Sequence, residues 1–158
     1  MADESRVKSA AAGGLYSRMT VLGETNLTAL IGNMRPTLQP GTCCFCTWSH
    51  ERSPDISVLG SFREAEGLTL IVDESDAIAQ QLQCHFRSAW ITLAVHSDLN
   101  AVGFLAAISR ALAKAGIPCD VVSALYHDHL FVPIELAARA MSVLEELTRT
   151  SGEPLDSP

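Results

Sequence analysis

Two histidines flank an aspartate at His127-Asp128-His129, beside the apolar residues 130–132. Side chains with a changeable charge are costly to place next to a core unless another group pairs with them. In an extended chain His127 and His129 share one face, and Asp128 takes the opposite face. The stretch is therefore either a ligand or metal site, or a set of structural hydrogen bonds.

His-x-His spacing can chelate a metal ion, but structural zinc uses four ligands and catalytic zinc usually three. No second ligand pair with ordinary spacing stands out, and Cys43, Cys44 and Cys46 are candidates only if folding brings them close. We therefore predict no metal site and no cofactor. A metal-dependent enzyme that uses His127 and His129 stays open as an alternative.

Residues 95–103 form a second cluster, where a β-rich run meets an amphipathic helix. Free backbone N–H groups and the helix dipole at a helix start attract a carboxylate or a phosphate. Gly103 leaves the backbone open to a small ligand, and Ser97 offers a hydroxyl. The alternative interpretation is plain helix capping by Ser97, Asp98 or Asn100.

Glu64 and Glu66 form a third cluster, in the charged turn 63–67. At positions i and i+2 of an extended chain, two carboxylates lie on one side and could hold a ligand ammonium group. The alternative is a solvated hairpin turn in which Gly67 supplies an unusual backbone angle. The sequence has no G-x-S-x-G elbow, phosphate loop or dinucleotide fingerprint. We therefore do not expect an enzyme.

The composition limits the partners. Of 158 residues, 47% are hydrophobic and 18% are charged, which is typical of a globular protein. The net charge of −7 repels phosphate backbones, so we expect no nucleic-acid partner. No apolar run approaches the about 20 residues that cross a bilayer, so no membrane partner is expected. Five cysteines, an odd number, indicate reduced thiols and a cytoplasmic protein.

The elements that must position these clusters fall into two halves, between a flexible leader at 1–14 and a flexible tail at 151–158. Their order predicts an α+β fold, with an antiparallel sheet and helices on one face. In the first half, Thr25 can cap a helix of apolar residues at helical spacing, which Pro36 stops. Strands at 42–47, 56–62 and 68–72 and a short helix from Asp73 to Leu82 follow. In the first of these strands we expect Cys43 and Phe45 to point to one face and Cys44 and Cys46 to the other.

In the second half, a strand at 89–95 leads into a helix over 101–115, which Gly116 ends. We expect Ala101, Leu105, Ile108 and Leu112 to form the buried stripe of that helix. Strands at 119–124 and 130–132 follow, and Pro133 is expected as the first residue of a last helix.

Three stretches together carry a family resemblance: Phe62 to Leu70, Leu93 to Gly103 and Tyr126 to Pro133. They resemble three ordered signatures of the small ACT-domain proteins long catalogued as a domain of unknown function, which are similar to the amino-acid-sensing tandem ACT proteins. The resemblance covers roughly residues 23–147. It implies two ferredoxin-like ACT (βαββαβ) modules, at residues 15–82 and 83–150, packed side by side.

ACT modules commonly bind free amino acids and usually regulate rather than catalyse. The resemblance therefore implies a non-catalytic regulatory protein that binds an amino acid at a module interface, near the strand-to-helix turn. In arginine-sensing relatives the Val-His-Ser motif helps to hold the ligand, and it corresponds here to Val95, His96 and Ser97. A homodimer would restore the four-module arrangement of those sensors. A protein-interaction or structural module without a ligand is the alternative.

The predicted site combines the three clusters. The ligand carboxylate would meet the backbone N–H groups around Ala101 to Gly103, and its ammonium group would meet Glu64 or Glu66. The stretch 127–129 would close the site or lock the interface between modules. The predicted ligand-binding residues are Glu64, Glu66, Val95, His96, Ser97, Ala101, Val102, Gly103, His127, Asp128 and His129.

Overall fold

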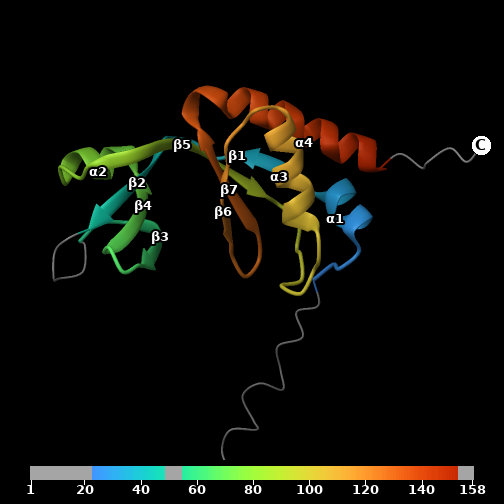
Figure 1. Ribbon diagram of the computed structural model, residues 1–158, viewed down its shortest axis with the longest axis horizontal. Helices are drawn as coiled ribbons and strands as arrows, with labels where there is room; N and C mark the ends of the chain where they lie inside the picture. The colour runs from blue at the N-terminus through green and yellow to red at the C-terminus, as the bar shows by residue number, and fades with distance from the viewer. Residues whose placement is uncertain (1–22, 49–54, 153–158) are drawn as a thin grey trace, which may run out of the picture.

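Seven strands form one antiparallel sheet, and the helices cover one of its faces (Figure 1). The computed structural model describes residues 23–48 and 55–152. The strands are β1 (Pro36–Leu38), β2 (Cys43–Trp48), β3 (Val58–Arg63), β4 (Leu68–Asp73), β5 (Cys84–Leu93), β6 (Asp120–Ser123) and β7 (Asp128–Pro133). The helices are α1 (Leu27–Asn33), α2 (Glu74–Ala79), α3 (Phe104–Lys114) and α4 (Ala137–Gly152), with the 3-10 turn η1 (Ile134–Leu136) before α4. The sheet order is β3-β4-β2-β5-β7-β6, with β1 paired to β5, and the predicted α+β fold is confirmed.

β5 belongs to both halves of the sheet. Along one edge its residues 84–88 pair with β2 and its residues 91–93 pair with β1. Along the other edge its residues 88–93 pair with β7. This ten-residue strand therefore joins β3-β4-β2 to β7-β6 in a single sheet, and Figure 1 shows the two groups on either side of it.

Residues 23–38 pack against the second half of the protein. Leu30 and Ile31 of α1, and Met34 directly after it, are buried in one core with α3 and α4, and β1 pairs with β5. The sequence did not predict β1, because Pro36 was interpreted only as a helix stop. Proline is compatible with the first residue of an edge strand, since no ladder hydrogen bond is needed there. The module boundary after residue 82 stays a prediction.

Two helix starts differ from the sequence-based expectation. The N-cap of α1 is Asn26, whose side-chain oxygen accepts the N–H of Ala29 at 2.9 Å, and not Thr25. α3 begins at Phe104 rather than Ala101, because Gly103 has a φ of 94° and cannot continue a right-handed helix. The buried stripe of α3 shifts accordingly to Phe104, Ile108 and Leu112.

Other strand and helix ends also differ from the predicted ones. β5 begins at Cys84 instead of 89 and ends at Leu93 instead of 95. Pro133 has extended angles, so it closes β7 and η1 follows it. Residues 151 and 152 of the expected tail still belong to α4, whereas the expected leader and residues 153–158 lie outside the described residues. No helix in the described ranges is both long and apolar enough to cross a membrane.

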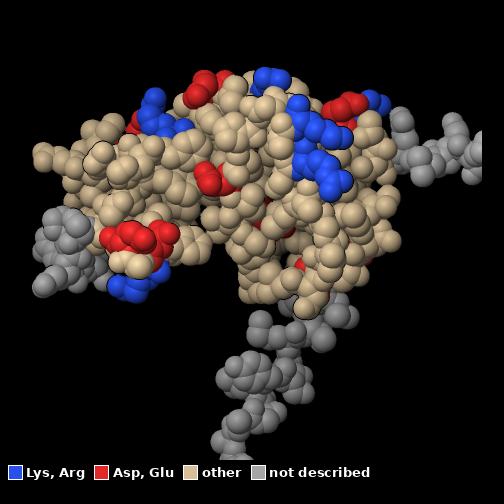
Figure 2. Space-filling model, in the orientation of Figure 1, with Lys and Arg blue, Asp and Glu red and all other residues tan. Residues whose placement is uncertain are grey.

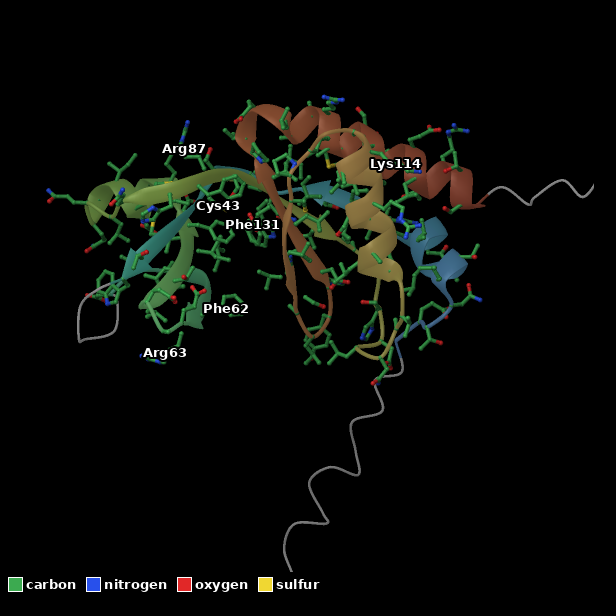
Figure 3. All side chains as sticks on the ribbon, viewed as in Figure 1. Cys43, Phe62, Arg63, Arg87, Lys114 and Phe131 are labelled. Atoms are coloured by element: carbon green, nitrogen blue, oxygen red, sulfur yellow. The ribbon has the colours of Figure 1, made fainter. Side chains whose placement is uncertain are left out.

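The alternation predicted for β2 is confirmed. Cys44 and Cys46 pack on the face covered by α2, and Cys43 and Phe45 pack on the opposite face with Phe131 of β7. Figure 3 shows Cys43 and Phe131 near the middle of the molecule, where the two halves of the sheet meet. Asp73 caps α2 as predicted, although the helix ends at Ala79 and not at 82.

Candidate functional site

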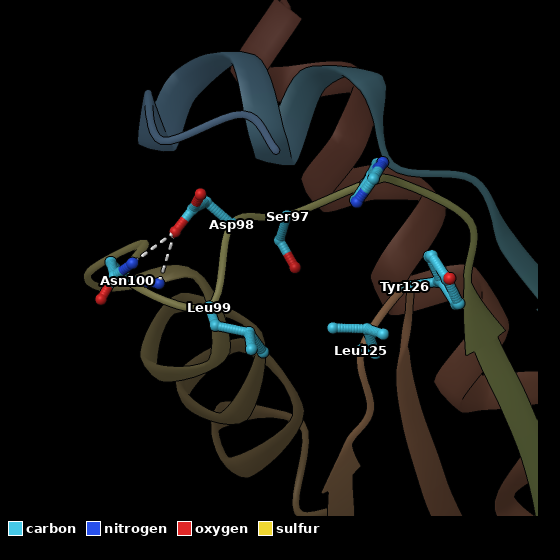
Figure 4. A pocket seen from close by; sticks show the side chains of 7 residues that line it. Ser97, Asp98, Leu99, Asn100, Leu125 and Tyr126 are labelled. Carbon is cyan, nitrogen blue, oxygen red and sulfur yellow. Dashed lines mark hydrogen bonds between the residues drawn. The ribbon is translucent and has the colours of Figure 1, made fainter. Parts of the chain in front are cut away.

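The loop between β5 and α3 lies beside the turn between β6 and β7 (Figure 4). The space between them is a hollow of about 230 Å³, called the outer hollow here. A second space of about 160 Å³, the inner hollow, shares Ser97, Asp98 and Leu99 with it and reaches the first turn of α3 and Asp128. The outer hollow is lined by His96, Ser97, Asp98, Leu99, Asn100, Leu125 and Tyr126.

Asp98 holds the β5–α3 loop in shape. Its carboxylate accepts the backbone N–H and the side-chain amide of Asn100, each at 2.8 Å, and its carbonyl accepts the N–H of Ala101 at 2.8 Å. The backbone N–H of Asn100, followed by its side-chain amide, lowers the pKa of Asp98 below the usual aspartate value. The carboxylate is therefore engaged by its own loop, as Figure 4 shows.

The segment before α1 holds the β5–α3 loop in place through backbone hydrogen bonds. The N–H of Glu24 donates to the carbonyl of His96 at 2.9 Å, and the N–H of Asp98 donates to the carbonyl of Glu24 at 3.1 Å. Gly23 lies so close that a Cβ atom there would be 2.3 Å from the Asp98 nitrogen. The position therefore requires glycine, and the start of the described chain is part of the site's frame.

The N-terminus of α3 is open to a ligand. Its N-cap is Gly103, which has no side chain to bond the first-turn N–H groups, and no side chain of residues 23–48 or 55–152 caps this helix instead. The inner hollow is lined in part by Gly103, Phe104, Leu105 and Ala106, whose N–H groups belong to this turn. Capping of α3 by Ser97, Asp98 or Asn100, the alternative considered from the sequence, does not occur.

Asp128 faces this helix start from the neighbouring strand. Its side chain is only 2% exposed, and it accepts hydroxyl hydrogen bonds from Ser123 at 2.6 Å and from Ser97 at 3.2 Å. Within the described part of the chain, no Lys or Arg forms an ion pair with this carboxylate. A buried carboxylate with hydroxyl partners alone can still accept a cationic donor from a ligand.

The two histidines of the opening motif lie away from Asp128. His127 Nδ1 is 3.4 Å from the Val95 carbonyl oxygen. His129 Nδ1 accepts the indole N–H of Trp90 at 3.0 Å and lies 3.2 Å from the Thr92 hydroxyl, on the sheet face opposite the helices. No cluster of three or more His, Cys, Asp or Glu side chains suited to a metal occurs among residues 23–48 and 55–152. The structure thus shows hydrogen-bond partners for both rings.

Acidification is expected to destabilise the protein through His129. Burial lowers the pKa of His129, the neighbouring His127 lowers it further, and the nearby Asp128 opposes both effects. Because the folded pKa lies below the unfolded value, the unfolded state binds the extra proton first, and stability falls as the pH drops below about 6.5. Urea unfolding between pH 7.5 and 5 measures this loss. His129→Gln should flatten this part of the profile, and an unchanged slope would contradict the assignment.

Glu64 and Glu66 do not reach either hollow within one chain. They lie in the turn between β3 and β4, which is separated from β6 and β7 by the rest of the sheet. The Glu64 carboxylate accepts the hydroxyl of Thr69, and the Glu64 N–H donates to the Gly67 carbonyl at 2.8 Å. The acidic side chains of this turn are exposed (Figure 2, beside Arg63 as labelled in Figure 3). Their contacts match the hairpin turn considered as the alternative.

The structure unites two of the three predicted clusters. His96, Ser97, Ala101, Gly103 and Asp128 line the hollows, Val95 contributes a carbonyl to His127, and Val102 is 83% exposed next to them. The sequence-based prediction lacks Ser123, Leu125 and Tyr126, which the chain reversal between β6 and β7 brings beside the β5–α3 loop. The sequence predicts Asp98 and Asn100 only as helix-capping residues. The residues missed are Asp98, Leu99, Asn100, Phe104, Leu105, Ala106, Ser123, Leu125 and Tyr126.

Comparison with known proteins places the chain in a family. Two family models, both described as ACT domain, match residues 22–89 and 86–146. The chain belongs to the ACT-domain family. It carries two ACT domains in tandem, as predicted from its three motifs, and the two matched ranges overlap within β5, the strand that both halves of the sheet use.

Solved structures show the same fold. The tandem ACT chain is 38% identical to a Vibrio cholerae protein described as of unknown function and a possible transport protein, with a TM-score of 0.71 over 77% of this chain and 95% of the other. An Agrobacterium tumefaciens protein is 17% identical, with a TM-score of 0.58 over 73% and 89%. The regulatory subunit of aspartate kinase from Thermus thermophilus is 11% identical, with a TM-score of 0.53 over 71% and 95%. No protein of curated function matched.

Proposed function

We propose that this tandem ACT protein is a non-catalytic regulator that binds a free amino acid in the two neighbouring hollows. The observation that carries the proposal is the position of Asp128, a buried carboxylate that lines the same hollow as the open start of α3. A free amino acid carries one ammonium and one carboxylate a few bonds apart. The inner hollow offers a partner of the opposite charge for each of them.

The ligand carboxylate fits the start of α3. Unpaired N–H groups and the positive end of the helix dipole favour an anion there. Gly103 keeps the approach free of a side chain, and Ser97 lies alongside. The ammonium group fits Asp128, because a charge-assisted hydrogen bond to a buried carboxylate is strong. We assign this contact to Asp128 instead of Glu64 and Glu66, which line neither hollow.

The ligand side chain fits the outer hollow. Its wall combines the rings of His96 and Tyr126, which meet edge to face at 6.0 Å, with the apolar Leu99 and Leu125. A pocket with apolar walls and a few polar groups is the usual form of a small-molecule site. The volume of about 230 Å³ suits an amino-acid side chain and not a large cofactor.

The candidate nucleophiles support a non-catalytic role. Burial raises the pKa of Cys44 to about 12 and also raises that of Cys46, so both thiols stay protonated near neutral pH. The Ser97 hydroxyl bonds Asp128 rather than a histidine base. All five cysteines are free, which supports the proposed cytoplasmic location. A homodimer belongs to the same proposal.

A protein-interaction role is the second candidate, and one observation favours it. Four large apolar side chains near the outer hollow are exposed: Leu99 by 67%, Val102 by 83%, Leu125 by 47% and Tyr126 by 57%. Such a rim is typical of a surface that another protein covers. Both roles agree if a bound amino acid changes the affinity of this rim for a target protein.

A thermal-shift panel of the free amino acids tests the proposal. An amino acid present at 100 times its dissociation constant should add about 2.7 kcal/mol of stability. The variant Ser97→Ala should weaken that shift, since it removes a hydroxyl from both hollows, and Ser109→Ala on the exposed face of α3 serves as the matched control. If no amino acid at millimolar concentration stabilises the protein, the interaction role without a ligand is favoured.

A further inference from the structure

The groove between α3 and α4 lies far along α3 from the hollows and takes no part in the proposed amino-acid site. It measures about 530 Å³. Lys114 of α3 is labelled in Figure 3, and Figure 2 shows blue side chains gathered over this region of an otherwise acidic protein. The groove is lined by Ala111, Lys114, Arg139, Ser142, Val143, Glu146, Leu147 and Thr150.

The lining of this groove is more apolar than its residue types indicate. The Ser142 hydroxyl donates to the Ala138 carbonyl at 3.1 Å, and the Thr150 hydroxyl donates to the Glu146 carbonyl at 2.9 Å. Both hydroxyls are thereby satisfied within α4. Together with Val143 they form a floor that can be covered without leaving an unpaired polar group.

The charges at the rim are arranged for self-association. Arg139 and Lys114 form no ion pair with any residue in the described ranges. Arg149 donates to both carboxylate oxygens of Glu146, at 2.6 Å and 3.1 Å, but both side chains are about 60% exposed, so water screens this pair. Each oxygen has a further lone pair, and the carboxylate can therefore accept another donor beside Arg149. The groove therefore carries two cations without an ion pair in those ranges, Arg139 near the start of α4 and Lys114 on α3, and an exposed carboxylate, Glu146, two turns beyond Arg139 on α4.

We infer that this groove is the surface through which two copies of the chain form a homodimer. Positions 139 and 146 are equally far from the midpoint between Ser142 and Val143. If the two α4 helices run antiparallel across a two-fold axis at that midpoint, Arg139 of each copy faces Glu146 of the other. The same symmetry places Leu147 against Ala138, and the small Ser142 at the axis lets the helices approach closely.

This arrangement meets the requirement of a two-fold interface, in which one surface must complement itself. The inference rests on the homodimer of the proposed function and assigns its interface to this groove. The interface leaves both hollows open. An acidic helix from another protein is the competing occupant. Charge swapping distinguishes a second copy of the chain from an acidic helix of another protein. Only an interface between two copies allows two variants, each of which repels itself, to dimerise with each other.

The experiment measures the mass of the full chain in solution by sedimentation equilibrium. The wild type should be a dimer. Arg139→Glu places two carboxylates together twice per dimer, and Glu146→Arg places two cations together twice. Each variant alone should raise the dimer Kd at least about tenfold, which corresponds to about 1.4 kcal/mol. An equimolar mixture of the two should regain wild-type dimerisation, because both cross pairs are then opposite in charge.

The control Arg63→Glu makes the same charge change on β3, outside the groove, and should leave the dimer unaffected. Ser142→Arg, at the proposed axis, should also dissociate it, and circular dichroism verifies that each variant is folded. A monomeric wild type, a dimer that resists the variants, or a mixture that stays monomeric would overturn the inference. Calorimetric titration of Arg139→Glu with the amino acid from the thermal-shift panel keeps the two proposals apart, since binding should persist in the monomer.

Discussion

Asp128→Asn is expected to weaken amino-acid binding by about 30-fold or more, with little effect on the fold. Loss of one partner from a buried, hydrogen-bonded charge pair costs at least about 2 kcal/mol. Asparagine has nearly the same shape as aspartate, and its amide can still accept from Ser123 and bond Ser97. The substitution therefore removes the negative charge while keeping the two local hydrogen bonds.

Isothermal titration with the amino acid found in the stability panel measures this effect. Asp120→Asn on the exposed side of β6 is the matched control, and its affinity should equal that of the wild type. The melting temperature of Asp128→Asn should stay close to that of the parent. If the affinity of Asp128→Asn is unchanged while the protein still binds its ligand, Asp128 is not the ammonium partner.

Leu30→Ala is expected to destabilise the whole protein by about 2–5 kcal/mol, although Leu30 lies near the start of the described chain. Its side chain is fully buried in the core formed with α3 and α4, and truncation leaves a cavity there. Because α1 packs against α4 and β1 pairs with β5, the loss should reach the second half of the sheet. Urea denaturation monitored by tryptophan fluorescence measures the change.

Hydrogen exchange shows where the destabilisation acts. In Leu30→Ala, the amides of α4 should exchange faster than in the wild type. Ile78→Ala, at a position of α2 that is 71% exposed, is the control and should change stability by no more than about 0.5 kcal/mol. Two independently folding halves would instead show faster exchange before residue 82 alone, and that pattern would contradict the shared core.

The sequence alone was enough to predict the elements that depend on neighbouring residues. Alternating residues marked β2 and placed Cys43 opposite Cys44, and the capping carboxylate of Asp73 marked the start of α2. Such features depend on side-chain periodicity and on hydrogen bonds between residues a few positions apart, so the local sequence is enough to predict them. The three motifs likewise indicated the ACT family, which the family models confirm.

The tertiary structure decided which of these residues meet. Asp128 and Ser97 are separated by 30 residues of chain, and only the return of β7 alongside β5 places their side chains 3.2 Å apart. The same pairing sends His129 to the opposite face, where Trp90 binds it, and leaves Glu64 at the far end of the sheet. β1 and α1 also joined the second half for this reason: strand pairing and core burial act across distance in sequence, where no local pattern specifies the partner.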